Sequence, residues 1–141
     1  MPDIIDKSIL ESGIKAEHIS IFREWGEYLA TGKKAGSFIK DKSMSASQIR
    51  KFFNEIKRIQ ADFENSKNDI ILLDPKIAYA VGRAKKDAKK DEKVAIENFY
   101  KAISPLIRQI NYDKTKFKHF VNICEAIIAY HKEFEVNQKN K

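Results

Sequence analysis

Hydrophobic residues recur at steps of three and four along most of the chain, the spacing of one face of an α-helix. Such stripes cover residues 17–29, 49–63, 77–84, 96–110 and 117–134. Strand signals are nearly absent, because the run "DIILLD" is too short and too isolated to build a sheet. The pattern therefore predicts an all-α fold, a compact bundle of four to five principal helices.

The clearest helix start lies at Ser45. Ser45 and Gln48 have the spacing of a capping box, in which two backbone donors are satisfied reciprocally. Met44 and Ile49 occupy the positions of a hydrophobic staple around the same helix start. A helix is expected from here to the polar cluster at residues 65–68.

Two prolines give further boundaries. Asp74 before Pro75 predicts an N-cap followed by proline at the first helical position. Pro105 lies inside the stripe of residues 96–110 and is expected to kink that helix or to split it at Ser104. The last helix is expected to begin at Asp113 or Thr115.

The first forty residues carry weaker signals. A short helix ending at Gly13 is expected within residues 1–15, and a loop over residues 31–42 whose Phe38 and Ile39 tuck onto the body. The loop has some likeness to a phosphate-binding loop, but its Gly36 is followed by serine and not by lysine. Nucleotide binding is therefore not predicted.

The chain has the size and composition of one folded domain. It has 141 residues, 43% of them hydrophobic and 33% charged, enough to enclose one core. We expect a single helical domain over residues 1–141, with residues 1–15 and 135–141 frayed or peripheral.

The chain carries an excess of positive charge. The 27 lysines and arginines exceed the 20 acidic residues, for a formal charge of +7 and a pI near 9.4. Such an excess fits an anionic partner such as nucleic acid or a membrane surface, and it fits simple solubility equally well.

The chain offers little for catalysis or for an extracellular setting. Its single cysteine, Cys124, forms no internal disulfide and lies on an apolar stripe, as a small buried side chain would. His18, His119 and His131 lack the spacing of a metal site. With no leader pattern and no apolar run of membrane-spanning length, we expect a cytoplasmic protein that is not an enzyme, holds no metal or cofactor, and has no membrane partner.

Basic residues gather on the helix after Ser45. Arg50 and Lys51 form one pair and Lys57 and Arg58 another, seven residues apart, with Asn54 between them. Such a ridge suits a phosphate backbone, for which arginine offers a matching fork. The outer face of any surface helix carries charge too, so the spacing alone leaves both interpretations open.

A second basic segment follows Gly82. Glycine inside a helix costs on the order of 1 kcal/mol relative to alanine, so Gly82 predicts a close approach of another helix or of a ligand strand. Arg83 comes next and the lysine-dense residues 85–93 follow, either as a solvated helix end or as a loop.

Four segments in order resemble one family. "SASQIRKFFNEIKRI" (45–59), "LLDPKIAYAVGRAK" (72–85), "FYKAISPLIRQI" (99–110) and "FKHFVNICEAIIAYHK" (117–132) are similar to the small subunit of the type III-A CRISPR effector, the Csm complex. The match covers residues 44–132. The resemblance implies a compact helical subunit of an antiviral defence complex that has no enzymatic activity of its own.

The resemblance also implies partners. Family members stack in several copies as an inner filament, beside the backbone subunits and the large polymerase-like subunit, and contact the crRNA–target RNA duplex through basic side chains. Self-association is expected, and in isolation it could give a dimer. The RNA-binding residues that it implies are Arg50, Lys51, Lys57, Arg58, Arg83, Lys85, Lys86 and Lys132.

Other features of the match do not point to RNA. Tyr79 and Tyr130 also fit the family pattern and are expected to be packing residues. The length and charge of the tract of residues 85–93 depart from that pattern and are not assigned to a family role. Two alternatives stay open, a helical protein–protein adaptor without nucleic-acid binding and a sequence-tolerant DNA-binding protein.

Overall fold

The computed structural model describes residues 2–33, 36 and 38–139, with only the backbone of residues 137–139. The described part is all-α, as the sequence predicts. Its elements are α1 (Ile9–Ser12), a 3-10 turn (Ala16–His18), α2 (Ile19–Thr31), α3 (Ala46–Ala61), α4 (Phe63–Ser66), a 3-10 turn (Lys67–Asp69), α5 (Leu73–Asp87), α6 (Ala95–Ile110) and α7 (Lys114–Lys139).

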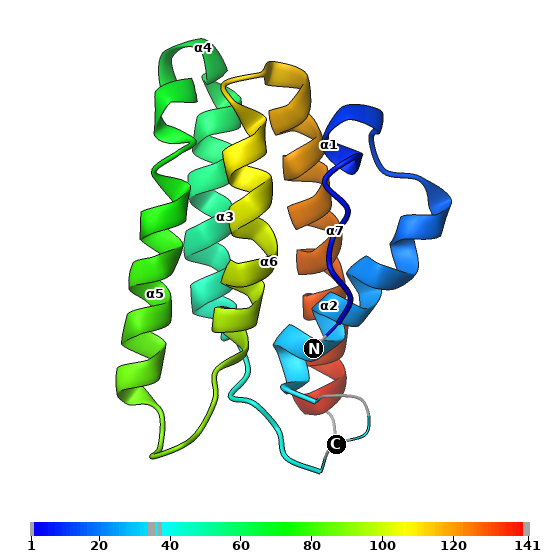
Figure 1. The fold of residues 1–141 in the computed structure, drawn as a ribbon. Helices are drawn as coiled ribbons and strands as arrows, with labels where there is room; N and C mark the ends of the chain where they lie inside the picture. The colour runs from blue at the N-terminus through cyan, green and yellow to red at the C-terminus, as the bar shows by residue number, and fades with distance from the viewer. Residues whose placement is uncertain (1, 34–35, 37, 140–141) are drawn as a thin grey trace.

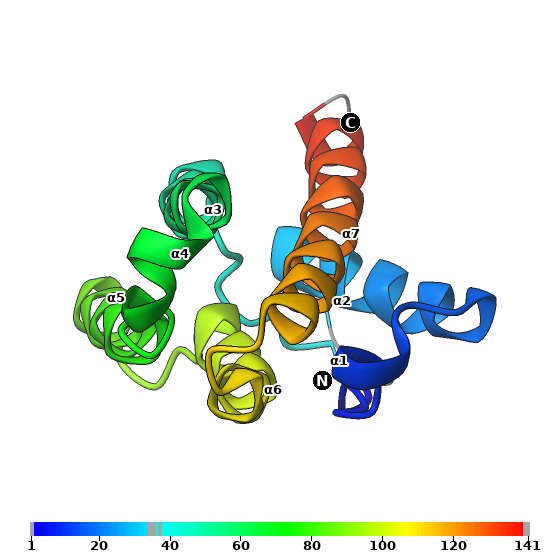
Figure 2. The same ribbon diagram turned by 90° about the horizontal axis from the view of Figure 1, so that it is seen from above.

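The long helices lie side by side, and α5 and α2 stand on opposite sides of the molecule (Figure 1). The main helix pairs are α2 with α7 and α5 with α6. Seen from above, α3, α5 and α6 group on one side of α7, with α1 and α2 on the other (Figure 2). The helices at the two ends of the chain therefore form one half of the molecule.

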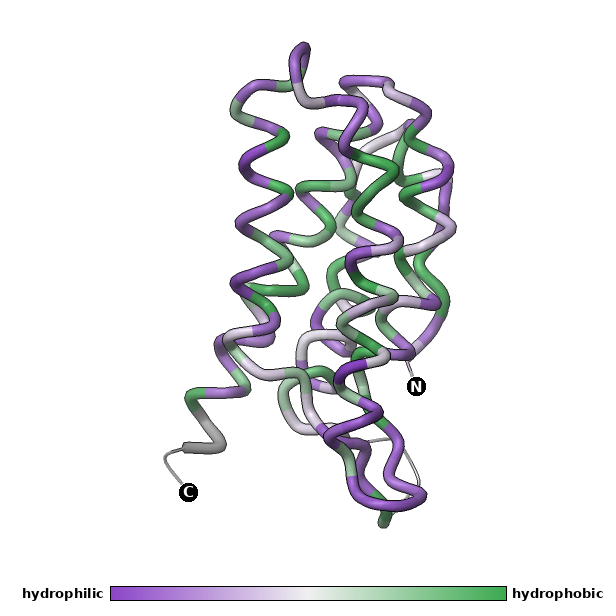
Figure 3. The backbone as a smooth tube through the Cα atoms, turned by 90° about the vertical axis from the view of Figure 1, so that its left-hand side faces the viewer, coloured by the Kyte–Doolittle hydropathy of each residue, from purple (hydrophilic) through white to green (hydrophobic). Residues whose placement is uncertain are grey.

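The core fills the space between these helices. Apolar and polar positions alternate along them with helical periodicity (Figure 3), and each helix turns its apolar stripe inward. The largest fully buried side chains come from α2, α6 and α7. They include Phe22, Trp25, Phe99, Phe117 and Phe120.

The capping box is confirmed. The Gln48 backbone N–H donates to Ser45 Oγ at 3.1 Å, and the Ser45 backbone N–H donates to Gln48 Oε1 at 2.8 Å. Met44 and Ile49 are both buried, at 3% and 5% exposure. Local sequence thus sets the start of α3, which forms one wall of the groove described below.

The N-cap predicted at Asp74 is wrong. Helix α5 begins at Leu73, two residues before the predicted start at Pro75, and Asp74 lies in its first turn. Its carboxylate accepts hydrogen bonds from the Tyr100 hydroxyl at 2.7 Å and from the Ser104 hydroxyl. Two donors on α6 therefore take the carboxylate that would otherwise have capped α5.

The split predicted at Ser104 is also wrong, because α6 continues through Pro105 to Ile110. Ile103 and Leu106, on either side of Ser104 and Pro105, are fully buried at 0% exposure. Proline removes one backbone hydrogen bond, but packing of the apolar face on its neighbours holds the helix together.

The N-terminal segment is anchored to the body. Residues 1–15 were expected to be frayed or peripheral, yet Ile5, Ile9 and Leu10 are buried at 2% or less. Helix α1 ends at Gly13 as predicted, with φ of +82°. Phe38 and Ile39 do not tuck in as predicted, since their side chains are 105% and 74% exposed.

The segment that leads into α3 is fixed at Asp41 and Lys42. Asp41 accepts a hydrogen bond from the Tyr28 hydroxyl, and its carbonyl lies so close to Gly32 that a Cβ there would clash. Lys42 forms an isolated parallel bridge with Val94. These contacts hold Lys42 near Val94, directly before the start of α6. Within residues 2–33, 36 and 38–139, no helix is long and apolar enough to cross a membrane.

Candidate nucleic-acid interface

A groove of about 540 Å³ runs between α3 and α5, with α6 at its base. It opens because α3 packs chiefly on α7 while α5 packs on α6. The groove is lined by apolar side chains that include Phe52, Ile77, Ala80 and Phe99.

Cations line the mouth of this groove. Lys51 of α3 and Lys76 and Arg83 of α5 come from facing walls, and Lys42 adds a fourth positive charge. Lys51 and Arg83 are exposed, and neither makes an ion pair with another described residue. The structure thus brings together two residues that lie 32 positions apart in the sequence (51 and 83).

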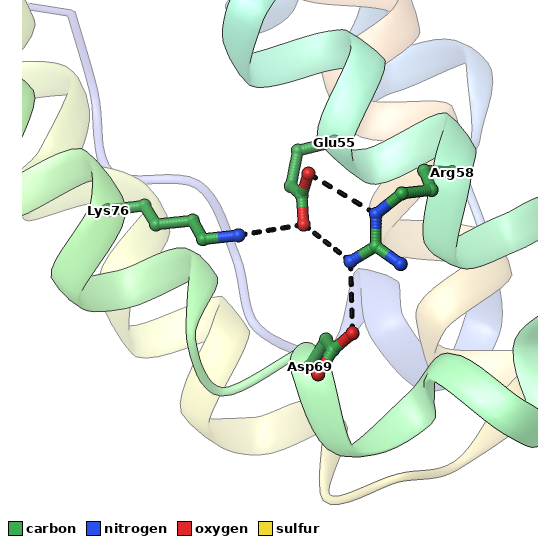
Figure 4. A network of polar contacts seen from close by, with 4 residues as sticks. All are labelled: Glu55, Arg58, Asp69 and Lys76. Atoms are coloured by element: carbon green, nitrogen blue, oxygen red, sulfur yellow. Dashed lines mark hydrogen bonds and ion pairs between the residues drawn. The ribbon is translucent and has the colours of Figure 1, made fainter.

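Arg58 is held by two carboxylates. Its Nη2 atom lies 2.6 Å from Glu55 Oε1 and 3.0 Å from Asp69 Oδ2, and Lys76 Nζ reaches the same Glu55 oxygen at 2.8 Å (Figure 4). The hydrogen bonds from Arg58 and then Lys76 lower the pKa of Glu55 to about 2. The charge of Arg58 is therefore largely neutralised within the chain.

The four basic residues predicted on α3 divide between two flanks of the helix. Each residue advances the helix by about 100°, so Lys51 and Arg58 turn toward α5 while Arg50 and Lys57 turn away from it. Lys57 Nζ lies 3.8 Å from Glu125 Oε1 of α7. The predicted ridge is thus two strips, of which only the one with Lys51 borders the groove.

The basic residues predicted on α5 and α7 also separate. Lys85 faces α6, where it pairs with Glu97, and Lys86 is exposed near the end of α5. Lys132 is exposed on α7. Among the predicted residues of α5, only Arg83 lines the groove. The lysine-dense tract is helical to Asp87 and a loop beyond it.

No helix of the described chain approaches Gly82. A Cβ added there would meet nothing within 4 Å, so the predicted close approach of a neighbouring helix is wrong within one copy. The glycine in helix-to-helix contact is Gly26 of α2, where an added Cβ would meet Tyr130 and would lie 2.7 Å from the His131 nitrogen. Gly82 instead lies on the outer face of α5.

The two tyrosines differ. Tyr130 packs against the core as predicted, with the Arg23 guanidinium 5.6 Å from its ring centroid. Tyr79 is 69% exposed and lines the groove, so its prediction as a packing residue is wrong. Tyr79 lies off the hydrophobic stripe of α5, which runs through Ile77, Val81 and Ala84.

Sequence reasoning missed Lys42, Lys76 and Tyr79 as groove residues. For α5 a signal exists, since Lys76, Tyr79 and Arg83 are spaced by three and four and so share one flank of the helix. For Lys42 no such signal exists. Its position depends on the bridge to Val94, a contact between distant parts of the chain.

His119, His131 and Cys124 contribute to the packing of the fold. His131 Nε2 lies 2.8 Å from the Met44 carbonyl and His119 Nδ1 lies 2.6 Å from the Leu10 carbonyl. Cys124 is fully buried, and burial raises the pKa of its thiol. In the described part of the chain, no group of three or more His, Cys, Asp or Glu residues could hold a metal ion.

A small helical bundle whose apolar groove is edged by cations has features that suit a binding or scaffold subunit. The family model described as Csm2 Type III-A matches residues 24–137. The chain therefore belongs to this family, and it is a non-catalytic small subunit of a type III-A CRISPR effector, which assembles with other Csm subunits and crRNA. No curated protein and no solved structure matches it.

Proposed function

We propose that this subunit stacks in several copies as an inner filament of the effector and contacts the crRNA–target RNA duplex through basic side chains. Lys51 and Arg83 make the principal contacts. The observation that carries this proposal is that these two cations line one groove from facing helices, and that neither forms an ion pair in the described part of the chain. A cation without an intramolecular partner can bind a phosphate without first breaking a salt bridge.

The other predicted residues contribute less. Arg50, Lys86 and Lys132 are exposed and add to the positive field around the duplex. Lys57, Arg58 and Lys85 already pair with carboxylates, so a phosphate must compete for them. Binding by one copy is therefore weak, and stacking along one duplex raises the effective concentration of each further contact.

Recognition of the backbone fits this arrangement. Guide pairing supplies sequence specificity in RNA-guided systems, and the protein reads backbone charge and shape. Lys51 and Arg83 come from two helices, α3 and α5, that form the facing walls of the groove. Self-association follows from stacking, because a head-to-tail contact between copies is open-ended.

The test is titration of single-stranded RNA, an RNA duplex and duplex DNA at two salt concentrations. We expect salt-dependent binding of RNA. For single-stranded RNA, the double variant K51Q/R83Q should reduce the slope of log binding constant against log salt concentration by about 1.4, roughly 0.7 for each lost phosphate contact. The matched control K7Q/K15Q removes the same charge beside α1, on the side of the molecule opposite α5 (Figure 1).

Other outcomes would support other functions. Absence of RNA binding, both by the chain alone and in the assembled effector, contradicts the proposal and favours the adaptor. Preference for duplex DNA favours the DNA-binding alternative. Equal losses in K51Q/R83Q and K7Q/K15Q mean that net charge, and not the groove, carries the interaction.

A further inference from the structure

We propose that the α3–α5 groove is a site for a nucleobase turned out of an RNA strand, with the neighbouring phosphates on Lys51 and Arg83. This inference rests on the proposed RNA-binding function and states what the groove recognises. Backbone contact alone requires only a charged surface. The groove has features that such a surface does not need.

The first feature is its shape. A volume of about 540 Å³ falls within the range of small-molecule sites, roughly 300–1,000 Å³. The walls include Ile77 and Ala80 of α5 and Phe52 of α3, all of them apolar. A flat aromatic ligand can bury its faces against these apolar walls, which removes apolar surface from water.

The second feature is Tyr79. Its side chain is 69% exposed at the groove, and it lies on the flank of α5 that also carries Lys76 and Arg83. An exposed aromatic ring beside cations is the arrangement by which proteins hold unpaired bases, since every base has a face that stacks on a ring. Nothing in the described chain needs Tyr79 to be aromatic.

The third feature is the charge around the mouth. Lys42, Lys51, Lys76 and Arg83 contribute four positive charges against the carboxylates of Glu55 and Asp87. Glu55 already pairs with Arg58 and Lys76. A ligand that is apolar at its centre and anionic at its edges therefore complements the groove, as a base with flanking phosphates does.

An acidic protein helix fits less well. A helix in a groove needs apolar rows along both walls for its anchors at i, i+3, i+4 and i+7. The residues of α3 that border the groove outside Phe52 are polar, namely Gln48, Lys51 and Glu55. Tyr79 is the one large apolar side chain at the mouth, which suits a single flat ring.

The experiment compares three RNA duplexes that differ at one position, binding to the full-length chain at low salt. One duplex is fully paired, one carries a single unpaired nucleotide, and one carries an abasic unit at that position. We expect the unpaired nucleotide to raise affinity about tenfold over the other two, the size of one base-stacking contact.

Variants assign the preference to the groove. Tyr79→Ser should remove the tenfold preference, and Tyr79→Phe should retain it. Ala80→Leu fills the groove and should also remove it. Tyr112, 49% exposed beyond the end of α6, supplies the control Tyr112→Ser, which should behave as wild type. Circular dichroism and thermal unfolding verify the fold of each variant.

The inference and the proposed function fail in different ways. If the wild type binds the three duplexes with equal affinity and K51Q/R83Q loses affinity for all of them, the base site is wrong and the proposed RNA binding is retained. Absence of binding to every RNA, both by the chain and by the assembled effector, overturns both. If Ala80→Leu blocks assembly of the effector and the base preference persists, the groove is a protein interface and the inference is wrong.

Discussion

The Tyr100 hydroxyl donates a hydrogen bond of 2.7 Å to Asp74 Oδ1 and thereby ties α6 to the first turn of α5. The Ser104 hydroxyl donates to the other oxygen of the same carboxylate. Because α5 carries Arg83 and Tyr79, these bonds help to set the orientation of one wall of the groove. The hydrogen bond to Asp74 also raises the pKa of Tyr100, because the hydroxyl must keep its proton to donate it.

Asp74→Ala should therefore destabilise the protein. It leaves the buried hydroxyl of Ser104 without its partner, which costs about 1–3 kcal/mol. Asp74→Asn, which keeps an acceptor oxygen, should cost less. Urea unfolding of both variants checks this order, and equal stability of D74A and wild type would show that the hydroxyls find other partners.

Two glycines should respond to alanine in opposite directions. Gly26→Ala places a methyl group against Tyr130 and the His131 backbone, and we expect a loss of at least about 2 kcal/mol from overpacking. Gly82→Ala meets nothing within 4 Å inside α5 and should gain roughly 0.5–1 kcal/mol. Unfolding midpoints of the two variants measure both effects.

Gly82→Ala also tests why glycine stands at that position. If a neighbouring copy or the RNA approaches α5 there, the variant should be more stable as an isolated chain and yet assemble less well. Co-purification with the other effector subunits gives the second readout. A variant that is more stable and assembles normally would show that nothing approaches Gly82 closely.

Acid should weaken the contact between α3 and α5. The pKa of Glu55 is about 2 in the folded chain against 4.5 ordinarily. A group with a lowered folded pKa stabilises the fold above its ordinary pKa, and that contribution is lost as the pH falls from 4.5 through about 2. Because Glu55 is partly exposed, solvent screening limits the gain to roughly 1 kcal/mol.

The variant Glu55→Gln tests the contribution of Glu55 to the pH dependence of stability. Its free energy of unfolding should fall less steeply than that of wild type between pH 5 and about pH 2. At the acid end of this range the two proteins should have similar stability. Glu64→Gln, which removes a carboxylate from a more exposed pair with Lys67, is the control. Parallel pH profiles for wild type and E55Q would contradict the assignment.

The thiol of Cys124 should be unreactive in the native protein. It is fully buried in α7, and burial raises its pKa, so little thiolate forms at neutral pH. A thiol reagent should modify it only at the rate of unfolding, and in full once denaturant is added. Rapid modification of the native chain would mean that α7 opens locally.

Local sequence determined the parts of the fold that depend on neighbouring residues. Ser45 and Gln48 satisfy each other across one helical turn, so four residues of sequence suffice to predict the start of α3. Asp74 failed as an N-cap because donors 26 and 30 residues away bind its carboxylate. Pro105 failed as a break because packing against other helices outweighs one missing hydrogen bond.

For the proposed site, the sequence predicted candidate residues by type but not how they are arranged in space. The surplus of lysine and arginine, with the family resemblance, pointed to Lys51 and Arg83 among eight candidates. Sequence could not show that Arg58 and Lys85 face carboxylates on other elements, because those pairings arise only when helices pack. The exposure of Tyr79, by contrast, had a signal in its spacing from Lys76 and Arg83, which its prediction as a packing residue did not use.

The pairing of α2 with α7 has a consequence for synthesis on the ribosome. Trp25 of α2 is buried in a core that α7 helps to close, and α7 begins only at Lys114, long after α2 ends at Thr31. At about 5–20 residues per second, the apolar face of α2 waits several seconds for that partner. A chaperone that shields α2 on the nascent chain would act before any copy can enter the effector.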